Sequence, residues 1–133
     1  MRVDHIAIAV NNVEEALKNY RNILNIDKIH IEDIPNEKVR VVILTLEDTR
    51  IELLEPTADD SPISKYLKEK GEGIHHIAIT ADNIEQDVAR GQKHGMRFLG
   101  GIRTGSYGRK ITFIHPKSLN GVLTEFCQSP PNN

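Results

Sequence analysis

The sequence predicts an α+β protein built from two βαβββ modules related by a pseudo-twofold axis. Two observations lead to this prediction: a stretch near the start of the chain recurs in its middle, and the same order of strand-like and helix-like segments follows each copy. His76 lies 71 residues after His5 (76 − 5). At this spacing the matching segments are 6–8 with 77–79, both Ile-Ala-Ile, and 12–14 with 83–85. Chance rarely preserves so many matches in one register, so we interpret the chain as a repeat divided near residues 71–73.

The first half opens with a strand and a helix. Residues 3–10 are rich in β-branched side chains and alternate with a period of two, as strands do. Asn12 is a typical helix N-cap, and Val13, Ala16 and Leu17 begin an apolar face with helical spacing. The further strands expected in this half are 28–33, 39–47 and 50–55, and an additional short helix is expected over 61–70.

The second half repeats this order. A strand is expected over 74–80, Asn83 is the matching N-cap, and Gly95 is a helix stop. A unit of about 65 residues is marginal by itself, so we expect the modules 1–70 and 74–133 to form one domain, 1–133. The remaining strands expected here are 97–103, 109–115 and 121–126.

Composition narrows the function classes. The net charge of −2 provides no basic surface for nucleic acid or for anionic membranes. No apolar run approaches the roughly 20 residues of a membrane span, and no cleavable signal is visible. The single cysteine, Cys127, excludes an internal disulfide and favours a reducing compartment. We therefore expect a cytoplasmic protein, and we expect it to be a homodimer because short open sheets leave edges to cover.

Four polar residues interrupt apolar strands at repeated places. His5 shares a strand face with Ala7 and Ala9, and His76 occupies the equivalent place in the second module. Glu52 and Glu125 interrupt the last strand of each module, 73 residues apart (125 − 52), where an unpaired carboxylate would cost several kcal/mol. Two imidazoles and two carboxylates together are typical of a divalent metal site. A hydrogen-bonded core histidine is the ordinary alternative for a single such residue, and the repetition argues against it.

The segments that carry these residues resemble a known family. DHIAIAV, IELLEP, GIHHIAI and FIHPKSLNGVLTEFCQ are similar to the vicinal-oxygen-chelate (glyoxalase–dioxygenase) superfamily of paired βαβββ modules, and within it to the methylmalonyl-CoA epimerases. This resemblance covers almost the whole chain. It implies one divalent metal ion per chain, with Co²⁺ first and Mn²⁺, Mg²⁺, Ni²⁺ or Zn²⁺ as alternatives. The ligands that it implies are His5, Glu52, His76 and Glu125.

The resemblance also implies a reaction and a partner. The partner is a small acyl-CoA, and the reaction inverts C2 of methylmalonyl-CoA through an enolate stabilised by the metal. Such an inversion needs a proton carrier on each side of the enolate, and Glu125 is our candidate for one. Some relatives use a glutamate at the place of Val41 for the other. Here Glu52 or a water molecule has to take that role.

The sequence allows more than one role for several further residues and more than one function for the chain. In the HPKS turn, His115, Lys117 and Ser118 either line the mouth of the substrate site or only shape the turn. Arg109 is one of several cations that could meet coenzyme A phosphates. The alternative enzyme is a lactoylglutathione lyase with the same four ligands, and the alternative without catalysis is a metal-free small-molecule-binding protein. An extradiol dioxygenase is disfavoured, because its iron takes two histidines and one carboxylate.

Overall fold

The computed structural model describes residues 1–131, which form two compact units. The N-terminal unit spans His5–His75, and the C-terminal unit joins Met1–Asp4 to the chain from His76 onward. The boundaries fall inside two strands, β1 (Val3–Ala9) and β5 (Gly73–Thr80). The chain therefore passes from one unit to the other directly before each of the two repeated histidines.

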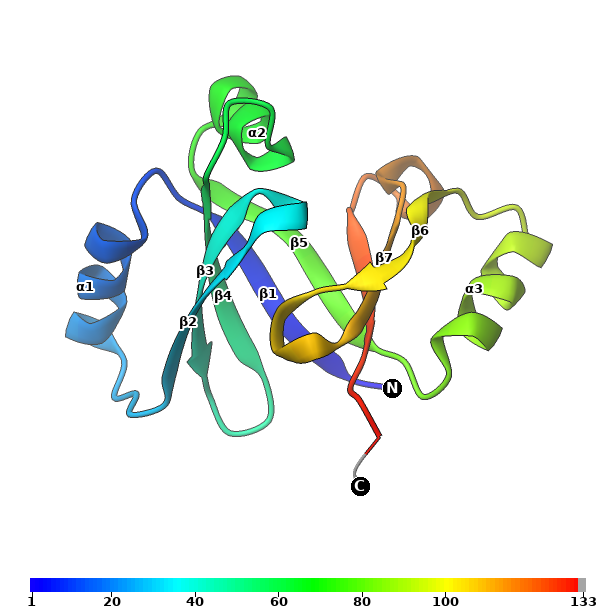
Figure 1. Cartoon of the computed structure of the whole chain (residues 1–133), viewed down its shortest axis with the longest axis horizontal. Helices are drawn as coiled ribbons and strands as arrows, with labels where there is room; N and C mark the ends of the chain where they lie inside the picture. Colours follow the sequence, from blue (N-terminus) through cyan, green and yellow to red (C-terminus); the bar gives the residue numbers. More distant parts are fainter. Residues whose placement is uncertain (132–133) are drawn as a thin grey trace. The chain divides into compact units, whose positions relative to one another are not determined.

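In the N-terminal unit, four strands of the sheet lie side by side in the order β2-β3-β4-β1. The first three strands pair antiparallel, whereas β4 and β1 pair in parallel. Helix α1 connects β1 to β2, and α2 follows β4 (Figure 1). The bounds are α1 (Val13–Ile23), β2 (Ile29–Ile34), β3 (Val39–Thr45), β4 (Arg50–Pro56) and α2 (Pro62–Lys70).

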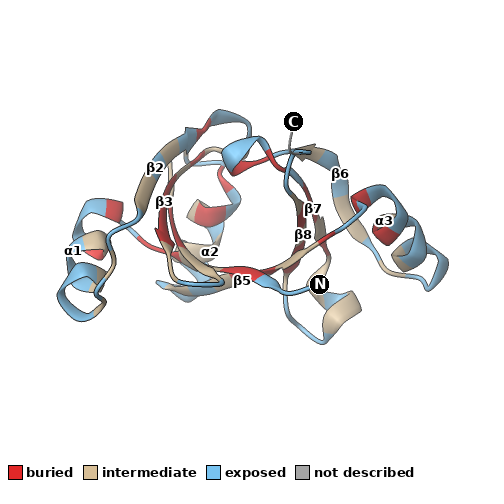
Figure 2. Cartoon of the chain, turned by 90° about the horizontal axis from the view of Figure 1, so that it is seen from below, coloured by how far each residue is buried: buried red, intermediate tan, exposed pale blue. Residues whose placement is uncertain are grey.

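Helix α1 is fixed at its start by a side-chain cap and along its length by an apolar stripe. The Asn12 side chain accepts a hydrogen bond from the Glu15 backbone N–H at 2.9 Å. Val13 and Ala16 are buried against one face of the sheet, Leu17 and Tyr20 pack partly buried beside them, and the opposite side of the helix is exposed (Figure 2). The core residues that they meet are Val10, which directly follows β1, and the strand residues Val42, Leu44 and Leu53.

The other face of the same sheet is covered in part by α2. Pro62 stands at the first helical position and the Ser61 hydroxyl accepts from the Ile63 backbone N–H, so the helix begins with two favourable signals. Its Ile63, Tyr66 and Leu67 pack on this face. The strand residues of this second core are Ala7, Ala9, Ile34, Val39, Val41, Ile43 and Leu54.

The C-terminal unit repeats the arrangement with the strand order β5-β8-β7-β6. Strands β5 and β8 pair in parallel, and the other two pairs are antiparallel. The Asn83 side chain caps α3 by accepting from the Gln86 N–H at 3.0 Å, and Gly95 follows the helix with φ +80°. The bounds are α3 (Ile84–Lys93), β6 (Phe98–Thr104), β7 (Lys110–Ile114) and β8 (Thr124–Gln128).

Each unit is thus a βαβββ module, which confirms the predicted fold class. The last strand begins later than its expected span of 121–126, because Gly121 has φ +90° and its N–H closes a turn onto Pro116 O at 2.7 Å. Glu125 still lies within the strand. No helix among residues 1–131 is long and apolar enough to cross a membrane. The pseudo-twofold axis and the merging of both modules into one domain stay predictions.

Candidate active site

In the N-terminal unit, β1 and β4 bring one histidine and one glutamate together. His5 Nδ1 lies 3.1 Å from Glu52 Oε2, and the two residues are only 2% and 4% exposed. The parallel register places Ala7 opposite Glu52, so the carboxylate shares a face with Ala7 and therefore with His5. This is the face that carries the apolar core under α2.

In the C-terminal unit, β5 and β8 form the equivalent pair. His76 Nε2 lies 3.7 Å from Glu125 Oε1, and each residue is 5% exposed. Ala78 stands opposite Glu125 in the parallel register, as Ala7 does opposite Glu52. The repeat in the sequence is therefore also a repeat of geometry.

The neighbours of both glutamates explain why water is excluded from them. On the antiparallel side, Ile43 stands opposite Glu52 and Phe113 stands opposite Glu125. The Phe113 ring also meets the His76 imidazole edge-on, with centroids 5.0 Å apart. Each carboxylate is thus enclosed between an alanine and a large apolar side chain, where an ionised group needs a positive partner.

The donor atoms in each unit suit a divalent metal ion. An imidazole nitrogen and a carboxylate oxygen are the ligands of the mixed nitrogen and oxygen sites that Co²⁺, Mn²⁺, Ni²⁺ and Zn²⁺ accept. Two ligands at right angles on one ion, each about 2.1 Å away, lie roughly 3 Å apart. The separations of 3.1 Å and 3.7 Å fall near this value. The chemistry and the spacing of both pairs therefore fit metal ligation.

His75 belongs to a different environment from His76. Its ring packs edge-on against Tyr66 of α2, with centroids 5.0 Å apart, and the Tyr66 hydroxyl donates to Ile74 O at 2.7 Å. Burial, with a smaller effect of Lys70, lowers the pKa of His75 to about 4. A neutral imidazole in contact with an aromatic ring is a packing residue, and alternation along β5 separates it from the face of His76.

The HPKS turn uses two of its three predicted substrate contacts for its own structure. His115 Nδ1 accepts from the Lys117 backbone N–H at 3.0 Å. The Ser118 hydroxyl accepts from the Arg97 backbone N–H at 3.0 Å. Lys117 itself is exposed. These hydrogen bonds support the interpretation that His115 and Ser118 shape the turn. Their contact with a substrate stays a prediction.

Val41 contributes no acid or base to the N-terminal unit. It is 1% exposed and lies in the apolar core with Val39 and Ile43. Its register partner on β4 is Leu54, two residues beyond Glu52 on the same face. A second proton carrier in this unit therefore has to come from a residue other than the one at position 41.

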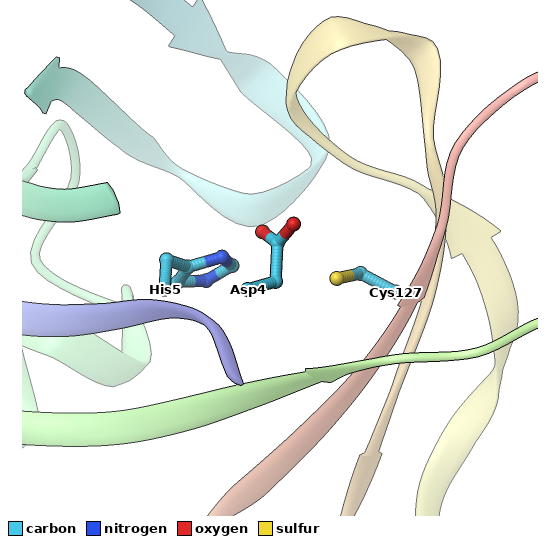
Figure 3. A group of neighbouring side chains, drawn as sticks. All are labelled: Asp4, His5 and Cys127. Atoms are coloured by element: carbon cyan, nitrogen blue, oxygen red, sulfur yellow. The ribbon is translucent and has the colours of Figure 1, made fainter. Parts of the chain in front are cut away.

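One buried ion pair was not anticipated from the sequence. Arg109 is 3% exposed, and its Nη1 donates to Asp4 Oδ2 at 2.6 Å, so this cation is not the exposed contact for coenzyme A phosphates that the sequence allowed. Asp4 and Cys127 lie side by side in Figure 3, and burial, followed by the charge of Asp4, raises the pKa of the thiol. The only sequence signal was Asp4 itself, an acid on the apolar face of β1 that includes Ile6 and Ile8.

Known proteins with similar sequences include a superfamily match and several epimerases. Residues 4–113 match the model of the glyoxalase/bleomycin resistance protein/dioxygenase superfamily. The ethylmalonyl-CoA/methylmalonyl-CoA epimerase of Cereibacter sphaeroides is 39% identical over 130 residues, which are 96% of this chain and 97% of that protein. The mitochondrial methylmalonyl-CoA epimerase of Homo sapiens is 40% identical over 130 residues, 96% of this chain and 74% of the human protein.

A solved structure extends the similarity to three dimensions. A variant of Streptomyces coelicolor methylmalonyl-CoA epimerase, in complex with 2-nitronate-propionyl-CoA, superposes with a TM-score of 0.95. The sequences are 37% identical, and the superposition covers 98% of this chain and 99% of that one. Similarity of this extent leaves little of the described chain outside the common fold.

Proposed function

The chain belongs to the glyoxalase/bleomycin resistance protein/dioxygenase superfamily, and from this premise we propose that it is a metal-dependent epimerase of methylmalonyl-CoA. The observation that carries the proposal is the buried His–Glu pair that recurs in both units, 3.1 Å apart in one and 3.7 Å in the other. Relatives named as epimerases of this substrate match nearly the whole chain, which supports the choice of reaction.

We assign His5, Glu52, His76 and Glu125 to one divalent ion, with Co²⁺ first and Mn²⁺, Mg²⁺, Ni²⁺ or Zn²⁺ as alternatives. Two carboxylates and two neutral imidazoles carry a summed charge of −2, which a divalent cation neutralises. When bound, the ion supplies a Lewis acid for the oxygens that flank the α-carbon of the substrate. Without a cation, four buried polar groups in apolar surroundings would be costly to the fold.

The carboxylates of this chain move the proton. Glu125 accepts it from C2, whose C–H electron pair then spreads into the thioester carbonyl as an enolate. Glu52 takes up a proton from water and passes it to the opposite side of C2, which inverts the centre. Glu125 then releases its own proton to water, so that both carboxylates are ionised again. We place Glu52 in this role because position 41 is apolar in this chain.

The proposed partner is a small acyl-CoA. The ligand in the Streptomyces coelicolor structure has a planar nitronate beside a thioester, which resembles the enolate in shape and charge. Around the acyl-CoA we expect contacts from the loop with His115, Lys117 and Ser118. The homodimer and the cytoplasmic location expected from the sequence remain parts of the proposal.

The direct test is proton exchange at C2. Protein loaded with Co²⁺ is incubated in D₂O with a single epimer of methylmalonyl-CoA, and we expect deuterium at C2 together with formation of the other epimer. Protein stripped with a chelator is the control and should regain activity when the metal is restored. Formation of lactoylglutathione from its hemithioacetal, without exchange at C2, would favour the lyase instead. Binding of small molecules without either reaction would favour the metal-free binding protein.

A further inference from the structure

Arg109 contacts several residues inside the C-terminal unit. Besides the bond to Asp4, its Nη1 lies 3.8 Å from the Cys127 sulfur. Its Nε and Nη2 donate to the carbonyl and the hydroxyl of Ser106, each at 3.3 Å. The guanidinium thus connects the start of β1, the end of β8 and the short 3-10 turn Ser106–Gly108 before β7.

The two side chains that Nη1 contacts, Asp4 and Cys127, lie close in sequence to two of the proposed metal ligands. Asp4 is followed directly by His5, and the Asp4–His5 peptide joins the C-terminal to the N-terminal unit. Cys127 follows Glu125 by two residues on β8 and shares its face. One planar group therefore contacts residues that lie next to two of the proposed ligands in the chain.

Asp4 and Cys127 are not themselves suited to a metal ion. The Asp4 carboxylate is already paired with the Arg109 guanidinium, and both side chains are 3% exposed. The Cys127 sulfur lies 3.8 Å from Nη1 of the same guanidinium, so a positive group already stands beside both side chains. Arg109 supplies the positive charge between these two side chains, so its role follows from the residues that it holds in position.

We propose that Arg109 and Asp4 are positioning residues that fix the start of β1, and with it the backbone of His5, and thereby tune the affinity for the metal ion. This inference rests on the proposed function. A buried ion pair is a poor source of net stability, because desolvation offsets much of the attraction. The planar fork of a guanidinium instead fixes direction as well as distance. Groups that orient metal ligands typically change metal affinity by about 10- to 100-fold when they are removed.

The test compares Co²⁺ binding by wild-type protein, by the double variant Asp4→Leu/Arg109→Met, and by Arg109→Lys. Replacing both charges by apolar groups avoids leaving one charge buried and unpaired, so the double variant should fold. Its Co²⁺ dissociation constant should rise by about 10- to 100-fold, with a changed visible spectrum and an unchanged far-UV circular dichroism spectrum. Arg109→Lys keeps the positive charge but lacks the planar guanidinium, and its Co²⁺ dissociation constant should lie between those of the wild type and the double variant. The control is Lys110→Met, which removes an exposed pair with Glu85 and should bind Co²⁺ as the wild type does.

The outcomes separate this inference from the proposed function. A folded double variant with wild-type Co²⁺ affinity and spectrum overturns the positioning role. If the double variant does not fold, Arg109→Lys decides, and wild-type affinity in that variant has the same consequence. Wild-type protein that binds Co²⁺ without epimerising methylmalonyl-CoA refutes the proposed function, while the affinity comparison still decides the role of Arg109. Wild-type protein that binds neither Co²⁺ nor any of the alternative ions Mn²⁺, Mg²⁺, Ni²⁺ and Zn²⁺ overturns both.

Discussion

The carboxylate of Glu52 lies 3.1 Å from the imidazole of His5, and both groups are buried beside an apolar core. Within a protein interior this contact serves either as a charged pair or as two ligands of one cation. The same pair recurs as His76 with Glu125 in the C-terminal unit. The first prediction separates the two roles.

His76→Ala should lower the bound metal sharply and abolish epimerisation while leaving the fold in place, because it removes one of the four proposed ligands. His75→Ala should retain metal and most activity, because that ring packs against Tyr66 of α2. Metal content measured by elemental analysis, with circular dichroism as the check on folding, distinguishes the variants. Equal metal retention in both would contradict the strand register proposed for the ligands.

Local sequence patterns were sufficient to predict the helices and strands. The internal repeat was sufficient to predict the two His–Glu pairs. Asn12 and Asn83 marked the helix starts, and alternation along β1 assigned His5 to the face of Ala7. The buried pair of Asp4 with Arg109 could not be predicted in this way. The two residues are 105 positions apart, and an arginine at the start of a strand is normally solvated, so nothing local indicates its burial.

The paired helix caps give a second prediction. Asn12→Ala and Asn83→Ala should each lower the free energy of unfolding by about 1 kcal/mol, because each leaves a backbone N–H of the first turn without its acceptor. Urea denaturation measures both, and Asn11→Ala is the control, since Asn11 contributes its backbone N–H to Glu72. A cost at only one of the two sites would show that the caps are not energetically equivalent.

Val41 gives a third prediction. Val41→Glu should lower the free energy of unfolding by about 3 kcal/mol or more, because the new carboxylate is buried among Val39, Ile43 and other apolar side chains. The control Ile31→Glu places the same group on a side chain that is 58% exposed and should have an effect within about 0.5 kcal/mol. Unfolding by urea compares them. Equal stability of the two variants would mean that position 41 reaches water or a cation, and would reopen it as a site for a second proton carrier.

The last prediction concerns Glu125 as a base. Glu125→Gln keeps an oxygen that can ligate an ion and keeps the shape of the side chain between Ala78 and Phe113, but it removes the proton acceptor. We expect the variant to bind a divalent ion more weakly and to exchange the C2 proton with D₂O about 10²- to 10⁴-fold more slowly for at least one epimer. NMR or mass spectrometry of the recovered acyl-CoA follows the exchange.

Glu52→Gln is the matched comparison for this test, because Glu52 occupies the same register position in the other unit. If each carboxylate carries the proton on one side of C2, each variant should exchange the C2 proton slowly with one epimer. The slow epimer for Glu125→Gln should then be the opposite of the slow epimer for Glu52→Gln. If Glu52 only ligates the ion, its amide should exchange both epimers nearly as fast as the wild type, and water has to deliver the second proton. Wild-type exchange of both epimers by Glu125→Gln protein loaded with metal would remove Glu125 as a base and leave Glu52 or bound water to start the reaction.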